Sequence, residues 1–207
     1  MRAQAGDVLH RLRRDTAAEH RAVEEALGLT DAGLTCARLV EVLTCLHGFW
    51  CAAEDGLDLW AAAEPAAAAE VEWSSRRRAG LYADDLAVLG RPPQDPSPRP
   101  RLPSVPDTDA ALGRLYVLEG STLGGVLIAR HLAGLPQVAS AGRLRSFTPY
   151  GAEAGARWQH YRQVTLARVA AGGDADRVVD AARVTFAGLA AWCDPPDRRG
   201  HRRPGAR

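Results

Sequence analysis

The 207-residue chain contains no lysine, so all 26 of its basic residues are arginine. It has 25 acidic residues and a formal net charge of +1, which gives no reason to expect nucleic acid or an anionic membrane as a partner. Arginine stays charged and makes planar, two-pronged contacts with carboxylates. Any basic binding pocket in this chain must therefore be built from arginine.

Cysteine motifs are also missing. The four cysteines, Cys36, Cys45, Cys51 and Cys193, form no CxxC pair and match no zinc-ligand spacing. They are expected to be small buried apolar residues in a reducing compartment. The N-terminus lacks the apolar core of a signal peptide, and no run of about 18 uncharged apolar residues occurs. We predict a cytoplasmic protein without a membrane span.

Strand signals are scarce as well. Alanine, leucine and arginine dominate, and apolar residues recur at three- and four-residue steps, as they do along helices. Seven prolines between Pro92 and Pro106 exclude helix from that segment. Thr30 or Asp31 is expected to cap the second helix and Gly90 to end the third. The pattern predicts helices over about residues 8–27, 34–63, 67–89, 107–132, 153–171 and 174–193. Together they form one all-α domain over residues 7–193, followed by a disordered basic tail over 194–207.

One face of the first predicted helix places a histidine among charged neighbours. At about 100° per residue, Arg13, Thr16, His20 and Glu24 share a stripe. A metal-binding imidazole needs an acceptor at its second ring nitrogen, and Glu24 at i+4 can supply it. The alternative is a surface i,i+4 pair beside an unrelated arginine. One histidine is too few for a protein-only zinc site but sufficient for a haem, and no CxxCH motif is present for covalent attachment.

The fourth predicted helix contains Gly120, Gly124 and Gly125, and each glycine costs a helix about 1 kcal/mol relative to alanine. Ser121, Gly124, Gly125 and Ile128 fall on one side, with Gly120 at its edge and Glu119 nearly opposite. This side predicts a groove and a kink. Close helix packing and a wall for a flat ligand both fit the pattern. A phosphate loop and a GxxxG membrane dimer do not, because GxxxxGK[ST] is absent and charged residues interrupt the apolar run.

Taken together, these segments resemble the haem oxygenase family, particularly its bacterial, biliverdin-producing branch associated with bacteriophytochromes. "LRRDTAAEHRAVE" resembles the proximal segment of that family, and "LYVLEGSTLGGVLIARHL" resembles its distal helix. "RRAGLYADDLAVLG" and "SFTPYGAEAGARWQHYRQ" also match the family pattern in order. The resemblance covers about residues 9–193. It implies a helical fold that holds haem between the first helix and a kinked, glycine-rich distal helix.

The resemblance also implies roles for single residues. His20 would be the axial ligand of the haem iron, and Glu24 would support it. Gly120, Ser121, Gly124 and Gly125 would form the distal wall. Many family members have an aspartate where this chain has Ser121, so the proton relay is unassigned. The other implied haem contacts are Arg13 and Arg162 near the propionates, with Thr16, Tyr116, Thr122, Ile128, Tyr161 and Phe186.

The implied reaction is the opening of haem b by O2 at a meso carbon, giving biliverdin, CO and iron. Haem would be both cofactor and substrate. The chain has no flavin or nicotinamide fingerprint, so a ferredoxin or reductase would supply electrons, and a bacteriophytochrome is a candidate receiver of biliverdin. Two alternatives are a haem carrier or sensor without turnover and a helical protein-interaction module. A di-iron protein would need several carboxylate and histidine ligands, and the core helices contain no ExxH pair.

Overall fold

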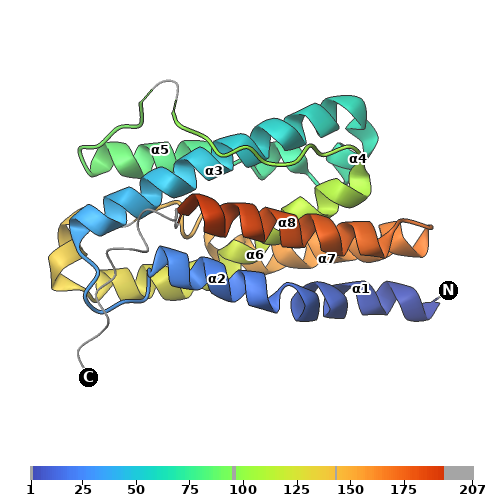
Figure 1. Ribbon diagram of the computed structural model, residues 1–207, viewed down its shortest axis with the longest axis horizontal. Helices are drawn as coiled ribbons and strands as arrows, with labels where there is room; N and C mark the ends of the chain where they lie inside the picture. Colours follow the sequence, from blue (N-terminus) through green and yellow to red (C-terminus); the bar gives the residue numbers. More distant parts are fainter. Residues whose placement is uncertain (1, 95–96, 143, 194–207) are drawn as a thin grey trace.

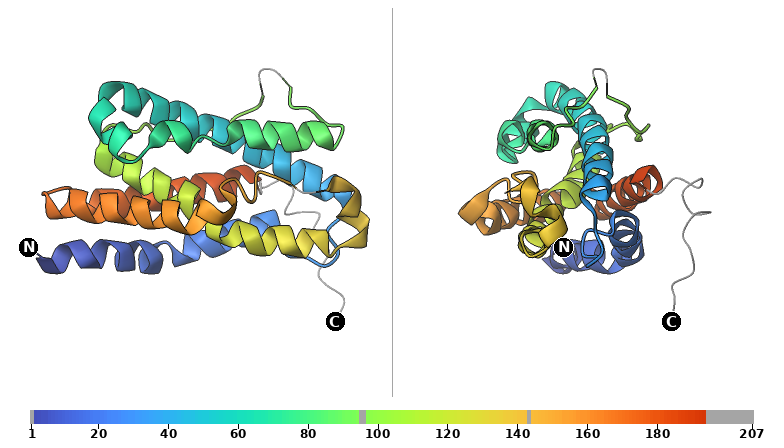
Figure 2. Two further views of the ribbon diagram at one scale, coloured as in Figure 1. Left: turned by 180° about the vertical axis from the view of Figure 1, so that it is seen from behind. Right: turned by 90° about the vertical axis from the view of Figure 1, so that its left-hand side faces the viewer.

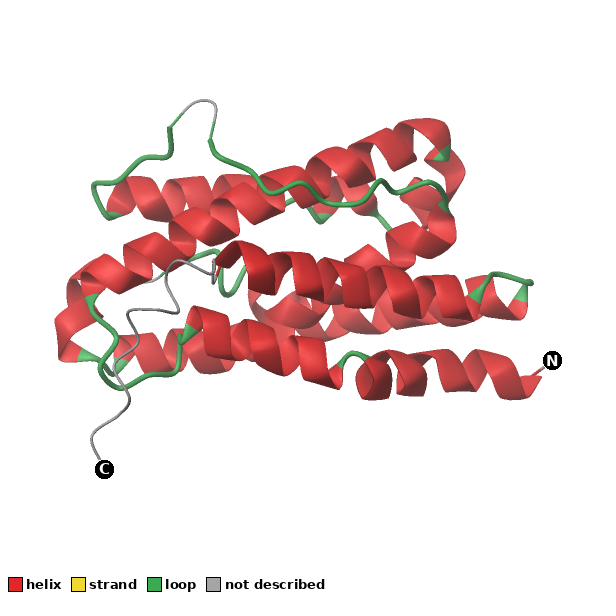
Figure 3. Ribbon diagram, viewed as in Figure 1, coloured by secondary structure: helices red, strands yellow, loops and turns green. Residues whose placement is uncertain are grey.

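The computed structural model describes residues 2–94, 97–142 and 144–193. These residues form eight α-helices and three short 3-10 helices, and no strand occurs among them (Figures 1 and 3). The all-α fold class is therefore confirmed. The tail predicted over 194–207 lies outside the described residues.

The helices follow one another along the chain in the order in which they are numbered. The α-helices are α1 (Arg2–Asp15), α2 (Ala17–Leu27), α3 (Cys36–Ala63), α4 (Pro65–Glu70), α5 (Ala79–Val88), α6 (Thr108–Ala133), α7 (Ala154–Ala170) and α8 (Ala175–Cys193). The 3-10 helices are η1 (Trp73–Ser75), η2 (Pro136–Ala141) and η3 (Gly151–Glu153).

Two predicted helices are divided in the structure. The helix predicted over 8–27 is interrupted at Thr16, where φ is −102° and ψ is 2°. The Thr16 hydroxyl donates to the carbonyl of Leu12 at 2.6 Å, a local bond that favours a bend. The helix predicted over 67–89 becomes α4, η1 and α5, because Glu72 adopts a left-handed conformation with φ of 55°.

The caps of α3 and α6 are side chains that accept a backbone N–H. The cap predicted for α3 at Thr30 or Asp31 is wrong: Thr35 caps it and accepts from the N–H of Arg38 at 3.2 Å. Asp31 instead accepts from the N–H of Gly33 within the preceding turn, at 2.8 Å. Asp107 caps α6 and accepts from the N–H of Ala110 at 2.9 Å.

Helices α6 and α8 pack against each other more extensively than any other pair of helices in the described chain. Helix α2 also packs on α8, α1 on α7, and α5 on α3 (Figure 2). In the left view of Figure 2, the first half of α6 slopes while its second half runs almost level, so the helix changes direction along its length. The core includes fully buried large side chains from α3, α5 and α6, such as Trp50, Trp60, Leu43, Leu86 and Leu112.

The described parts of the proline-rich segment, residues 91–94 and 97–106, contain no helix, as the prolines predicted, and the latter part runs along α3 (Figure 3). It approaches the helix closely at Gly48, where a Cβ atom would lie 2.3 Å from the carbonyl oxygen of Pro98. The buried guanidinium of Arg114 donates to the carbonyl oxygen of Pro103 and so fastens the segment to α6. Burial lowers the pKa of Arg114 to about 10.

Helix α3 has 28 residues, and an 18-residue stretch of it has a mean hydropathy of 1.2, so its length and composition would allow it to cross a membrane. Half of that stretch is buried inside the protein. A buried core helix has the same composition, so this property is weak evidence for a membrane span.

Candidate functional site

His20 lies on α2 with its imidazole 55% exposed. Its Nδ1 faces the carboxylate of Glu24 at 3.6 Å, which leaves Nε2 on the other side of the ring. The ring meets Phe186 of α8 edge-on, with centroids 5.4 Å apart. The i,i+4 pair predicted from the spacing is therefore formed, and the ring is supported on one side by the core.

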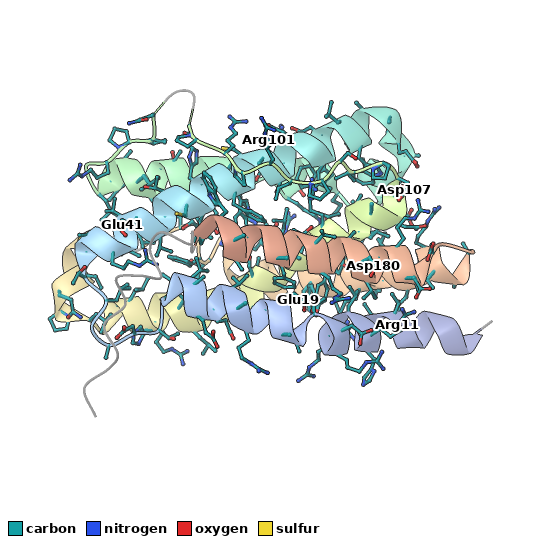
Figure 4. All side chains as sticks on the ribbon, in the orientation of Figure 1. Arg11, Glu19, Glu41, Arg101, Asp107 and Asp180 are labelled. Carbon is teal, nitrogen blue, oxygen red and sulfur yellow. The ribbon has the colours of Figure 1, made fainter. Side chains whose placement is uncertain are left out.

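Contacts on one side of α2 fix its orientation. Val23 and Ala26 are buried, and Glu19 accepts from Arg183 of α8 at 2.8 Å. Figure 4 shows Glu19 lying between α2 and α8. Gly28 ends the helix at φ of 58°, a conformation that favours glycine. These contacts hold α2 so that the His20 side chain points out of the bundle.

A chain of aromatic contacts connects His20 to α6. Phe186 contacts Tyr116 of α6 with centroids 6.3 Å apart, and Tyr116 contacts Trp158 of α7 at 5.8 Å. Burial raises the pKa of Tyr116, while a hydrogen bond with Thr16 and the charge of Arg13 act in the opposite direction. Thr16, Arg13 and Tyr116 are therefore neighbours at the junction of α1, α2 and α6.

The second half of α6 carries an open, apolar surface. A Cβ atom on Gly124 would have no neighbour within 4 Å, and one on Gly120 would first meet the Trp158 ring at 3.9 Å. Leu123, Val126 and Leu127 are 45%, 43% and 65% exposed. A contiguous exposed apolar surface of this kind is typical of a binding site.

Gly125 differs from Gly124 although the two are adjacent. A Cβ atom on Gly125 would lie 1.9 Å from the carbonyl oxygen of Phe147, so Gly125 allows the loop before α7 to press against α6. Thr122 is buried and donates to the carbonyl of Glu119 at 2.7 Å. Both therefore contact protein, whereas Ser121 and Gly124 are exposed.

The remaining predicted contacts are also located. Tyr161 is fully buried, and its hydroxyl donates to the carbonyl of Leu112 at 2.9 Å. Ile128 is half-buried against the core. Arg13 has no ion-pair partner among the described residues, and Arg162 donates only to the neutral Gln159, at 2.8 Å. Both cations are therefore available to an anionic group.

Arg78 is a site residue that the sequence reasoning missed. Its guanidinium is buried, donates from Nη1 to Ser121 Oγ at 3.3 Å and also donates to the carbonyl of Leu118. Its backbone N–H donates to Glu54 Oε1 at 2.6 Å. The signal in the sequence was the arginine run "RRR" between apolar helical segments. Nothing local identified that Arg76 and Arg78 turn inward while Arg77 stays exposed.

A cavity of about 750 Å³ lies elsewhere, between the first half of α3 and the proline-rich segment. It is lined by His47, Cys36, Cys45 and Trp192, with mainly apolar neighbours, and it includes none of the predicted site residues. Across the described residues, no group of three or more histidine, cysteine, aspartate or glutamate side chains is arranged to hold a metal ion.

Comparison with known proteins agrees with the resemblance over part of the chain. Sixty residues are 45% identical to a curated protein of Xanthomonas campestris pv. campestris (strain 8004) described as "Heme oxygenase". The match covers 29% of this chain and 34% of that protein, so the chain spans about a third of the length of the relative. No protein-family model and no solved structure matches the chain. The match supports the haem oxygenase family.

Proposed function

We propose that this protein is a haem oxygenase of the biliverdin-producing type, which binds haem b between α2 and the second half of α6. The reaction consumes O2 and external electrons and yields biliverdin, CO and iron. The observation that carries this proposal is the pairing of an exposed histidine on α2 with a glycine position on α6 that has open space beside it. His20 presents Nε2 on α2, and Gly124 leaves open space on α6.

The residues present fit a haem by three observations. The imidazole is exposed and oriented by Glu24 at 3.6 Å, as a single axial ligand requires. The exposed Leu123, Val126 and Leu127 offer apolar surface to a porphyrin. Arg13 and Arg162 lack a carboxylate partner in the described chain and can pair with propionates.

When bound, haem supplies the iron that activates O2 and the porphyrin that is cleaved. On the proximal side, His20 would hold the haem iron through Nε2, and the Glu24 carboxylate, 3.6 Å from Nδ1, would orient the ring through its second nitrogen. Phe186 meets the ring edge-on at 5.4 Å and restricts its rotation.

On the distal side, glycines replace side chains so that the α6 backbone can approach the bound group. Ser121 Oγ accepts from Arg78 and donates to the carbonyl of Leu118 at 2.7 Å. Ser121 is exposed as a residue, and rotation about its Cβ–Oγ bond would let the hydroxyl donate to a group in the open space instead. Arg78 acts by orienting Ser121 Oγ, to which it donates. In this proposal, Ser121 supplies the hydrogen bond for which many relatives use an aspartate.

Arg13 and Arg162 would each pair with one propionate of a bound haem. Such charge-assisted pairs would set the rotation of the porphyrin and so select the meso carbon that is cleaved. The electrons come from a ferredoxin or reductase. We place the reaction in the cytoplasm and propose a bacteriophytochrome as one receiver of biliverdin.

The test is to add haem to the purified protein, record the Soret band, and then supply O2 with a reductant. Appearance of a green bilin with release of CO supports the enzyme. A stable haem complex without bilin supports a carrier or sensor, and an unchanged Soret band supports a protein-interaction module.

The variant His20→Ala tests the ligand, with His160→Ala as its control. His160 is half-buried on α7, and among the described residues its ring nitrogen Nε2 faces the carbonyl of Glu70 at 2.8 Å. We expect His20→Ala to lose the wild-type spectrum and turnover and His160→Ala to retain both. A His20→Ala protein with the wild-type spectrum and turnover would refute the assignment.

A further inference from the structure

Two fixed points lie on either side of the open segment of α6. Glu119 precedes Gly120 and Ser121 and is buried at 1% exposure. Gly125 follows Gly124, and its Cα carries no side chain where the carbonyl of Phe147 presses against the helix. The residues exposed to the proposed haem site therefore lie between two points of contact with other parts of the protein.

The contact at Glu119 is a buried ion pair supported by a phenol. Arg76 donates from Nη1 to Glu119 Oε2, and Tyr150 donates from its hydroxyl to Glu119 Oε1 at 2.9 Å. Arg76 also donates to the carbonyls of Val71 and Arg157, so every nitrogen of its guanidinium has an acceptor. A charged pair with this many bonds resists rotation of α6 about its axis.

The contact at Gly125 comes from the same loop that supplies Tyr150. Asp85 of α5 accepts from the N–H groups of Arg145 and Ser146 at 2.9 Å and 2.8 Å, which holds the beginning of residues 144–150. Phe147 then lies against Gly125, and the ring of Tyr150 stacks with Arg157, whose guanidinium is 4.6 Å from its centroid. The loop is fixed to α5, α6 and α7.

We infer that residues 144–150 act as a splint that sets the position of the Gly120–Gly124 face of α6, with Tyr150 and Glu119 as positioning residues. The inference rests on the proposed function, because the distance between this face and His20 determines how closely the distal backbone approaches a bound haem. Neither residue touches the haem in this scheme. Tyr150 acts on Glu119, and Glu119 acts on the helix.

The test compares Tyr150→Phe with Tyr161→Phe. Each variant removes one hydroxyl whose hydrogen bond ends on α6, and each keeps its aromatic ring. Tyr150 bonds at Glu119, next to the glycines, whereas Tyr161 bonds to the carbonyl of Leu112 at the other end of the helix. A general loss of stability would affect both variants, while loss of the splint affects only Tyr150→Phe.

The first readout is amide hydrogen exchange of the haem-free protein. We expect Tyr150→Phe to speed exchange of the amides of residues 120–125 about tenfold, because a hydrogen bond to a charged acceptor is lost. Tyr161→Phe should leave these amides at the wild-type rate. Wild-type exchange in Tyr150→Phe, or equal acceleration in Tyr161→Phe, would overturn the inference.

The second readout is the C–O stretching frequency of the ferrous haem–CO complex, which senses groups near the distal face. It should shift in Tyr150→Phe, and a wild-type frequency in Tyr150→Phe would also overturn the inference. Because the exchange readout uses no haem, it stands even if the wild-type protein binds none. In that case the proposed function fails and the splint is judged by exchange alone.

Discussion

Gly124→Ala and Gly125→Ala should change stability in opposite directions, although the residues are adjacent in one helix. Gly124→Ala adds a methyl group in open space and replaces glycine by the best helix former. We expect it to stabilise the haem-free protein by about 1 kcal/mol. For a chain of this size, that corresponds to a rise in Tm of about 2–4 °C.

Gly125→Ala gains the same helix propensity but meets the carbonyl oxygen of Phe147 at 1.9 Å. A normal contact needs more than about 3 Å, so the loop must move, and it is held by Asp85. Overpacking in a core costs about 1–3 kcal/mol and occasionally more. After the gain of about 1 kcal/mol in helix propensity is subtracted, we expect the free energy of unfolding to fall by up to about 2 kcal/mol.

Both values can be measured by urea unfolding of the two haem-free variants, followed by circular dichroism. If Gly125→Ala were as stable as Gly124→Ala, the close approach of Phe147 to α6 would be wrong.

The bulkier variant Gly124→Leu separates the effect on folding from the effect on haem binding. It should fold as well as the wild type but block haem binding or turnover, and normal turnover would refute the distal wall.

Three further predictions concern charged and titratable groups. Burial, with the charge of Arg99, lowers the pKa of His47 below its ordinary 6.5. The unfolded chain therefore binds a proton that the folded chain excludes, and stability should fall as the pH drops below about 6.5. Urea unfolding at several pH values should show that His47→Gln loses less stability on acidification than the wild type does. The same pH profile in both proteins would contradict this role of His47. Glu119→Ala leaves Arg76 buried without its counter-charge and should cost about 3–5 kcal/mol in the same assay, whereas a loss below about 1 kcal/mol would mean that the pair is not buried. The single variants Arg13→Gln and Arg162→Gln should each weaken haem binding about tenfold in a spectrophotometric titration. Wild-type affinity in both variants would refute the assignment of these arginines to the propionates.

Periodicity predicted the helices because tertiary packing agrees with it over most of the chain. It could not predict the break at Thr16, because threonine is compatible with a continuous helix and the bend follows from a side-chain bond to Leu12. It also missed the division at Glu72, a non-glycine residue with φ of 55°. Both breaks depend on contacts that a single helical stretch does not reveal.

The candidate site was partly accessible from sequence for a similar reason. A helical projection correctly pairs His20 with Glu24, since both residues lie on one helix. The same projection groups Gly124 with Gly125, yet they occupy opposite edges of a stripe about 100° wide. One edge meets Phe147 and the other is open. Arg78 reaches Ser121 from a turn 43 residues away, a distance that no local pattern spans.

The glycines of α6 fall into two groups, according to whether close packing of another segment offsets their low helix propensity. Gly113 and Gly125 allow backbone to approach, since a Cβ atom would lie 2.2 Å from the Val178 carbonyl and 1.9 Å from the Phe147 carbonyl. The close packing of α8 and of the loop therefore offsets their low helix propensity. Gly124 has no such neighbour, so it weakens the helix by about 1 kcal/mol without any gain within the described chain. Stability alone favours alanine there, and the haem proposed above, which needs the space, would account for the glycine.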